Sequence, residues 1–189
     1  WKLALVVGGR APDSLLDTYQ AERHPVAARV LRNTMAQRAL GAADDRSGAL
    51  RDLVGQLLAM DEPRRYLAGM VSGLDVHYDL GECHPLVGRR LPDLDLVTGD
   101  GAVRAFSLLR DGRGALLDLG MPPALDPSPW SDRVRVVAAT VAGTWELPVV
   151  GSVEPPSAVL VRPDGYVAWT GNGTTDELHD ALTTWFGPR

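Results

Sequence analysis

One cysteine followed by a histidine is the first candidate for nucleophilic chemistry. Cys83 lies between Glu82 and His84, and a thiol beside an imidazole is a pair that many cysteine enzymes use to activate the nucleophile. Adjacent residues of an extended stretch point in different directions, however, and a nucleophile and its base usually meet from distant parts of a chain. We therefore expect Cys83 to be an inert, partly buried thiol.

The four histidines do not have the spacing of a metal site. His24, His77, His84 and His179 are scattered along the chain, and a metal ion would need several of them to converge with carboxylates. We expect no metal-binding residue, and we expect His24 to pack or hydrogen-bond where Pro25 interrupts its helix.

Charged and aromatic residues give three weaker candidates. Glu22 and Arg23 could reach a bound ligand, but a charged pair on a core helix must be solvated or paired, so we expect Arg23 to bridge to a preceding domain. Tyr19 is expected to be a buried aromatic with a hydrogen-bonded hydroxyl. Five tryptophans fit core or rim positions, with one in a proline-rich loop where it could contact a partner: Trp1, Trp130, Trp145, Trp169 and Trp185.

A long helix is predicted over residues 15–38. Its apolar side chains fall at three- and four-residue spacing on one face: Leu15, Leu16, Tyr19, Val26, Val30 and Thr34. Pro25 has no amide hydrogen and crowds the preceding turn, so a kink or break is expected near His24. Shorter helices are predicted up to Val7, over 47–58 and from Asp61, which makes residues 1–74 helical.

The period of the apolar residues changes after a predicted linker at residues 75–92. Short extended runs follow at 91–97, 103–106, 115–119 and 134–141, and the last two read as buried strands. A Pro-Asp-Gly turn joins 158–161 to 166–169 as a hairpin. A final helix begins near Thr174, which has capping-box spacing to Glu177.

This order predicts an α/β chain in which a helical segment precedes a thioredoxin-like domain at residues 93–189. Pro155-Pro156 lies where that fold often keeps a cis proline. Redox members carry a CxxC after the strand that is here 115–119, but this chain has Gly120-Met121-Pro122-Pro123-Ala124. Thiol–disulfide exchange is therefore excluded at that position.

Composition excludes several classes of protein. With 189 residues, 45% of them hydrophobic, the chain can bury one core and an appended segment. A net charge of -5 and no cluster of Lys or Arg argue against nucleic-acid binding. A single cysteine fits a reducing cytoplasm, and no apolar run approaches the roughly 20 residues that span a membrane.

Several stretches resemble one enzyme family. They are Trp1-Lys2-Leu3-Ala4, Gly8-Gly9, Leu15-Leu16-Asp17-Thr18-Tyr19, Glu22-Arg23-His24-Pro25-Val26, residues 29–37, and Arg162-Pro163-Asp164-Gly165-Tyr166-Val167-Ala168-Trp169. In order and spacing they are similar to the FAD-dependent aromatic hydroxylases, single-component flavoprotein monooxygenases, in the branch that acts on aromatic polyketides.

The resemblance implies a parent enzyme in which NAD(P)H reduces FAD, O₂ reacts with the flavin and an aromatic ring is hydroxylated. It places the FAD-contacting motifs of that family upstream of the matched region. The chain, which does not begin with Met, is then expected to be a C-terminal fragment that is itself structural and inactive. We therefore assign no catalytic, cofactor-binding or metal-binding residue, and expect FAD and NAD(P)H to act in the parent but not to bind the fragment.

The expected partner of the fragment is the missing N-terminal FAD domain, and helices that lack it are expected to self-associate. One alternative is a stand-alone thioredoxin-like module for interaction or dimerisation, without redox activity. A second is a thiol peroxidase or reductase that uses Cys83, which its place in the predicted linker disfavours.

Overall fold

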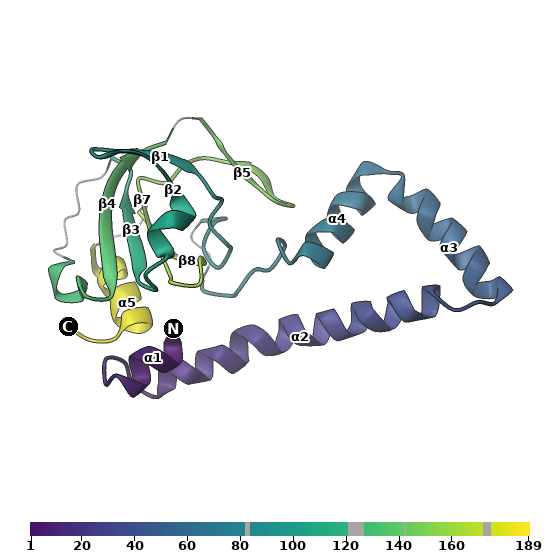
Figure 1. The fold of residues 1–189 in the computed structure, drawn as a ribbon, viewed down its shortest axis with the longest axis horizontal. Helices are drawn as coiled ribbons and strands as arrows, with labels where there is room; N and C mark the ends of the chain where they lie inside the picture. Colours follow the sequence, from purple (N-terminus) through teal and green to yellow (C-terminus); the bar gives the residue numbers. More distant parts are fainter. Residues whose placement is uncertain (82–83, 121–126, 142, 172–174) are drawn as a thin grey trace. The chain divides into compact units, whose positions relative to one another are not determined.

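The computed structural model describes residues 1–81, 84–120, 127–141, 143–171 and 175–189. The chain is α/β, with helices first and then a mixed sheet with a last helix (Figure 1). It forms two compact units: the helical unit, residues 19–76, and the sheet unit, which joins residues 1–18 to residues 77–189. Cys83, residues 121–124 and Thr174, all of which entered the sequence analysis, lie outside the described residues.

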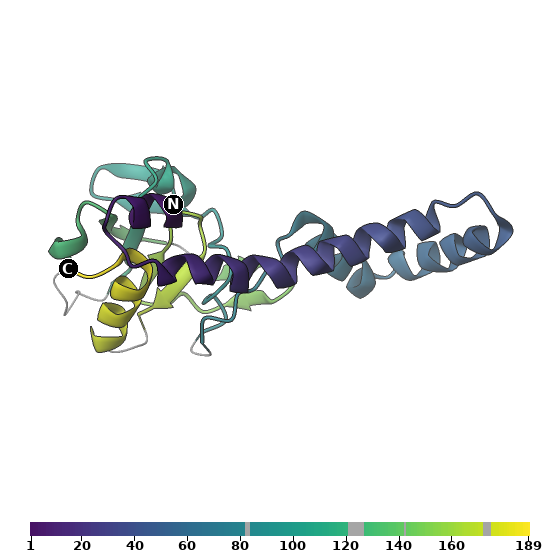
Figure 2. The same cartoon turned by 90° about the horizontal axis from the view of Figure 1, so that it is seen from below.

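Four helices open the chain where the sequence predicts them: α1 (Lys2–Val7), α2 (Ser14–Leu40), α3 (Asp45–Leu58) and α4 (Asp61–Ser72). Local signals set their ends. The Asp44 carboxylate accepts hydrogen bonds from the amides of Arg46 and Ser47 at the start of α3, and Gly73 ends α4 in the left-handed conformation. Pro25 lies inside α2, which continues through it as one helix, and the α2 ribbon is uninterrupted in Figure 2.

The helical unit buries few of its apolar side chains. An ion pair between Arg29 and Asp75, with an N–O distance of 2.7 Å, ties α2 to the end of α4. Tyr19 is 62% exposed, so the expectation that its ring is buried is wrong. Other large apolar residues of this unit are also exposed: Val30, Leu31, Met35, Leu50, Leu53, Leu57, Met60, Tyr66, Val71 and Leu74.

Six strands form the main sheet: β1 (Asp95–Thr98), β2 (Gly101–Arg104), β3 (Gly114–Asp118), β4 (Val134–Thr140), β7 (Ala158–Val161) and β8 (Val167–Thr170). Their order is β2-β1-β4-β3-β7-β8. Neighbouring strands run antiparallel except β3 and β4, which are parallel. The predicted strands at 115–119 and 134–141 and the 158–169 hairpin are thus confirmed. The extended runs predicted at 91–97 and 103–106 only overlap β1 and β2, because residues 91–94 lie outside a strand and Ala105 and Phe106 begin a 3₁₀ turn.

Burial differs between the two strands that were expected to be covered on both faces. The first four residues of β3 are buried, but β4 alternates, and Val136 is 45% exposed. An apolar run alone does not distinguish the two cases, because burial depends on which neighbours cover each face.

Residues 84–91, within the predicted linker, pack against the sheet. The Gly88 amide donates to Val167 O, and the Val167 amide donates to Arg89 O, both at 2.9 Å. This segment therefore covers the outer edge of β8, and Leu86 and Leu91 are almost fully buried. The division into domains at 1–74, 75–92 and 93–189 stays a prediction.

Gly88 is required by that packing. Its φ is +77°, and a Cβ there would lie 1.9 Å from the carbonyl oxygen of Tyr78. The Tyr78 amide donates to the Gly88 carbonyl at 2.8 Å, so the two backbone segments lie too close for any side chain at this position.

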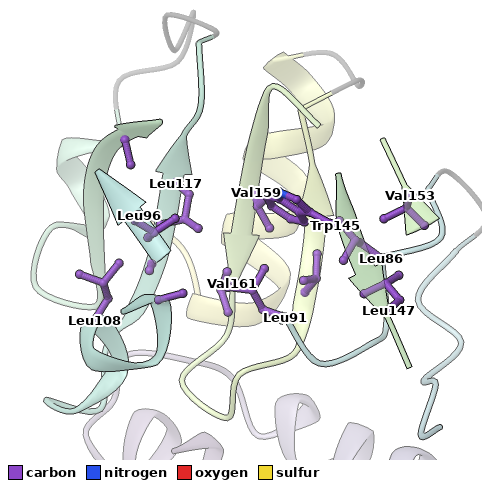
Figure 3. Packing of buried hydrophobic residues seen from close by; sticks show 14 of the residues in the cluster. Leu86, Leu91, Leu96, Leu108, Leu117, Trp145, Leu147, Val153, Val159 and Val161 are labelled. Carbon is purple, nitrogen blue, oxygen red and sulfur yellow. The ribbon is translucent and has the colours of Figure 1, made fainter. Parts of the chain in front are cut away.

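Both faces of the sheet carry a hydrophobic core. On one face, side chains of β1, β3 and β7 meet Leu86, Leu91, a 3₁₀ turn at Ala105–Leu109 and the small hairpin of β5 (Trp145–Leu147) and β6 (Gly151–Val153) (Figure 3). On the other face, α5 (Thr175–Phe186) packs on β3, β7 and β8 together with Leu15 and Trp130, which belongs to a 3₁₀ turn at Ser128–Trp130.

Two further findings complete the comparison with the sequence. No cis peptide bond occurs among the described residues, so the expectation of a cis proline at Pro155-Pro156 is wrong. In the described part of the chain, no helix combines the length and apolar character needed to cross a bilayer.

Candidate functional site

The turn between β7 and β8 places a charged pair inside the sheet unit. The Gly165 amide donates to Arg162 O at 2.9 Å and the Arg162 amide to Tyr166 O at 2.8 Å, which closes the turn. Gly165 has a φ of +85°, which a residue without a side chain adopts at no steric cost. Arg162 and Asp164 then point the same way: Arg162 Nη2 and Asp164 Oδ2 are 2.6 Å apart.

Arg162 is fully buried, with an exposed fraction of 0%. Aromatic rings surround its guanidinium: the Cζ atom lies 4.5 Å from the ring centre of Trp185, 5.4 Å from Trp1, 5.5 Å from Tyr78 and 5.8 Å from Tyr166. Rings offer a cation their electron-rich faces, and this attraction strengthens when water is excluded. We call Arg162, Asp164 and these four rings the arginine cluster.

The Asp164 carboxylate accepts hydrogen bonds from several parts of the chain. Arg162 Nε donates at 3.1 Å and Trp1 Nε1 at 2.9 Å. Burial would raise the pKa of Asp164, but the hydrogen bonds and charge of Arg162, with help from Trp1, outweigh it and hold that pKa below its ordinary value. The carboxylate is therefore ionised at neutral pH and compensates the buried guanidinium.

The first two residues, Trp1 and Lys2, pack against the same cluster. The Trp1 ring lies 6.5 Å from Trp185 and 6.2 Å from Phe186, both in α5. Lys2 is also buried; its Nζ donates to Thr18 Oγ1 at 2.6 Å and lies 5.3 Å from the Trp185 ring centre. The cluster thus joins α1, the first turns of α2, the 162–165 turn and α5.

A second contact fixes the same segment beside the C-terminal residues. Arg133 Nη1 donates to Phe186 O at 2.7 Å and to Arg10 O at 3.4 Å. Trp130 Nε1 donates to Gly187 O at 2.7 Å, and a Cβ on Gly187 would lie 1.9 Å from Arg10 O. Arg10 also forms an ion pair with Asp132.

Tyrosine chemistry at the cluster is suppressed. Tyr78 and Tyr166 stack with ring centres 4.4 Å apart. Burial, and then the neighbouring Tyr78 hydroxyl, raise the pKa of Tyr166, while Arg90 acts in the opposite direction. Tyr166 is therefore a neutral phenol at physiological pH and is not poised as a base.

The histidines considered from sequence lie apart. His77 Nε2 is 3.0 Å from Val87 O, and His84 Nε2 is 3.2 Å from Glu154 O. His179 packs edge-on against the Trp130 ring at 5.7 Å, and His24 is exposed on α2. In the described ranges, no three His, Cys, Asp or Glu side chains form a group suited to a metal ion. The assignment of no catalytic, cofactor or metal residue stays a prediction.

Arg162 and Asp164 were not singled out from the sequence, where they served only as a turn and as part of a resemblance. One signal was available. Arg162 directly follows the apolar run Ala158-Val159-Leu160-Val161, and a charge at the end of a buried strand must find a counter-charge. Its nearest acid in sequence is Asp164.

Comparison with known proteins gives two family matches. The model described as aromatic-ring hydroxylase, C-terminal, matches residues 84–188, and the model described as FAD binding domain matches residues 1–34. The two matches fall on the two partners of the arginine cluster: Trp1 and Lys2 lie in one, and Arg162, Asp164 and Trp185 in the other.

Individual relatives are similar over the whole chain. The anhydrotetracycline monooxygenase of Streptomyces rimosus is 49% identical over 198 residues, which cover 100% of this chain and 37% of that protein. The rifampicin monooxygenase of Rhodococcus hoagii is 42% identical over 187 residues, covering 99% and 36%. The solved structure of an anhydrotetracycline hydroxylase from Streptomyces rimosus superposes with a TM-score of 0.89 at 49% identity, over 100% of this chain and 38% of that one.

Substitutions of Arg162 and of Asp164 are expected to lower the free energy of unfolding by different amounts. Asp164→Ala leaves a fully buried guanidinium without its carboxylate and is expected to lower the free energy of unfolding by about 3 kcal/mol. Arg162→Met is expected to cost less, because the Asp164 side chain is 29% exposed and can be hydrated. Urea unfolding followed by tryptophan fluorescence measures both, and Asp95→Ala, in an exposed ion pair with Arg104, is the control expected to change little. An equal loss for Asp164→Ala and Asp95→Ala would contradict the structural role of the pair.

Acid is expected to weaken the same contact. Since the folded-state pKa of Asp164 lies below the unfolded value of about 3.9, its contribution is fully present above that value and is lost as the pH falls through the folded pKa. The difference in unfolding free energy between wild type and Asp164→Asn should be constant from pH 5 to 7 and shrink below about pH 4. A difference that persists undiminished at pH 3 would show that the charge of Asp164 is not what stabilises the turn.

Proposed function

The chain belongs to the aromatic-ring hydroxylases, and from that membership we propose that it is the C-terminal part of an FAD- and NAD(P)H-dependent monooxygenase that hydroxylates an aromatic polyketide-type substrate in the cytoplasm. The 49% identity to an anhydrotetracycline monooxygenase along the whole chain is the observation that carries the proposal. The chain spans about 37% of the length of that relative, so the activity belongs to the longer enzyme.

The proposal assigns no dinucleotide-binding residue to this chain. Phosphate groups are bound by the free amides at the start of a helix, usually after a glycine-rich turn. Here Gly8 and Gly9 follow the end of α1 instead, and the cluster around Trp1 is filled by Arg162 and Trp185. In the proposal, FAD, which supplies the oxygen-transfer chemistry, is held by the rest of the enzyme, and this chain alone is inactive.

The sheet unit is proposed to be a thioredoxin-like domain without redox function. Strands β4, β3, β7 and β8 are adjacent in that order, with β3 and β4 parallel, β7 antiparallel to β3, and α5 packed on one face. This order supports the assignment. The chain has one cysteine, so a CxxC pair is not available to it.

In the proposed enzyme, this chain contains a contact, here called the joint, between the end of the FAD-binding domain and the C-terminal domain. The match to the FAD-binding model ends at residue 34, and that to the C-terminal model begins at residue 84. Trp1 and Lys2, which lie in the first match, pack on Arg162 and Trp185 of the second. We infer that the arginine cluster fixes the C-terminal domain to the end of the FAD-binding domain.

The helical unit supplies a second surface for the same purpose. Leu50, Leu53 and Leu57 recur at helical spacing on α3 and are 47%, 54% and 44% exposed. Such a stripe is typical of a surface that packs on another part of a protein. The FAD-binding model matches only 34 residues of this chain, so the proposed occupant is the remainder of that FAD-binding domain.

A chimeric enzyme tests the proposed function. In the Streptomyces rimosus anhydrotetracycline monooxygenase, the aligned residues are replaced by this chain. The chimera is expected to purify with flavin absorbance between roughly 350 and 500 nm, where the cofactor itself absorbs, and to oxidise NADPH when anhydrotetracycline is added. The same chimera with Asp164→Ala is expected to retain less flavin, while the version with Asp95→Ala should match the parent chimera. A chimera that is folded by circular dichroism yet holds no flavin would refute the proposal.

Without that partner, the chain is expected to self-associate through the α3 stripe. At micromolar concentration, light scattering after size exclusion should give a mass above the 20.3 kDa of one chain. Leu53→Glu should weaken association at least about tenfold, because burial of a leucine contributes roughly 1.5–3 kcal/mol. Gln37→Glu adds the same charge on α2 and is the control that should associate like wild type. A protein that stays monomeric and binds no hydrophobic dye would show that the α3 stripe does not mediate self-association.

A further inference from the structure

A pocket of about 240 Å³ lies beside the 162–165 turn on the outside of the sheet unit. Its lining residues are Arg90, Phe106, Leu109, Arg110, Pro163, Asp164 and Gly165. They come from three stretches of chain that the fold brings together: the segment paired with β8, the 3₁₀ turn at Ala105–Leu109 with the residue that follows it, and the β7–β8 turn. Of the lining residues, Asp164 also belongs to the arginine cluster, and the other six have no role in the proposed monooxygenase chemistry or in that cluster.

The charges around the pocket do not cancel. Asp164 is the acid in the wall, but its carboxylate already accepts hydrogen bonds from Arg162 and Trp1. Arg90 packs over the Tyr166 ring at 5.6 Å. Within the ranges that the structure describes, Arg110 makes no ion pair or hydrogen bond with the protein. The Arg110 guanidinium is therefore available to a ligand, and Arg90, which also interacts with the Tyr166 hydroxyl, adds a second positive charge to the lining.

Nearby acids are committed elsewhere. Asp111 follows Arg110 in sequence, but its carboxylate is bound by Arg113 and by Arg135, each with an N–O distance of 2.7 Å. Those hydrogen bonds outweigh burial and hold the pKa of Asp111 below its ordinary value. The pocket therefore keeps an excess of positive charge, and guanidinium groups suit carboxylate or phosphate oxygens in pairs.

The apolar part of the lining includes Phe106, whose backbone is held by a hydrogen bond. Phe106 is 37% exposed, and its amide donates to Asp93 Oδ1 at 3.1 Å, which fixes the backbone that carries the ring. Leu109 and Pro163 add further apolar surface. Gly165 contributes only backbone to the lining, and its φ of +85° is one that residues with a side chain rarely adopt.

We propose that this pocket binds a small aromatic oxyanion, in which a carboxylate or phosphate meets Arg90 and Arg110 while a single ring lies on Phe106. The volume is below the roughly 300–1,000 Å³ of pockets for drug-sized ligands. It therefore suits a one-ring molecule better than a fused polyketide or a dinucleotide.

Nuclear magnetic resonance titration of the 189-residue chain tests the proposal with four probes. Benzoate and phenyl phosphate carry both ring and charge, benzamide carries the ring alone, and acetate the charge alone. Benzoate or phenyl phosphate is expected to shift the amide of Gly165 saturably, with a Kd at least about tenfold lower than those of benzamide and acetate. Whichever of the two binds more tightly identifies the oxyanion.

Two variants assign the binding to this pocket. Arg110→Gln removes a side chain that is exposed and makes no protein contact among the described residues, so the fold should be unchanged. It is expected to weaken the better probe at least about tenfold. Arg65→Gln removes an equally exposed arginine from α4 and should leave the Kd unchanged. Equal binding of benzamide, shifts confined to residues away from the pocket, or equal Kd values for wild type and Arg110→Gln would each overturn the proposal.

Discussion

The buried ion pair of Arg162 and Asp164 determines how several distant segments of the sheet unit pack together. A guanidinium that has lost its water must be compensated on every side. The β7–β8 turn brings a carboxylate to it, α5 brings Trp185, the segment after α4 brings Tyr78, and α1 brings Trp1. Four stretches of chain that are distant in sequence are thus positioned by one charge. A hydrophobic cluster alone would tolerate small shifts among them, whereas directed hydrogen bonds and ring faces specify one arrangement.

Local patterns were sufficient to predict most of the elements. Helical spacing predicted α2 and α3, and the Pro-Asp-Gly turn predicted the β7–β8 hairpin. These features depend on residues within a few positions of one another. The helix continues through Pro25, as the single predicted element over 15–38 requires, since one missing hydrogen bond does not end an element of 27 residues.

Features that depend on distant partners could not be predicted in this way. Tyr19 lies on the predicted apolar face of its helix, but its side chain is 62% exposed among the residues that the structure describes. The 75–92 stretch has the glycines and prolines of a linker, yet it packs because the outer edge of β8 offers it hydrogen-bond partners. The role of Arg162 follows from Trp1, Tyr78 and Trp185, which no periodicity connects. Under the proposed function, the apolar side chains of the helical unit are exposed because their partner is the remainder of the FAD-binding domain.

The placement of α1 has a consequence for the order in which this part of the molecule folds. Trp1 contacts Asp164, Trp185 and Phe186, and Arg10 lies against Gly187; Trp1 and Asp164 are 163 positions apart in the sequence. Domains usually fold as they emerge from the ribosome, beginning with the N-terminal part. Because α1 cannot complete its packing until α5 has been synthesised, closure of the sheet unit over α1 comes late relative to the synthesis of that helix.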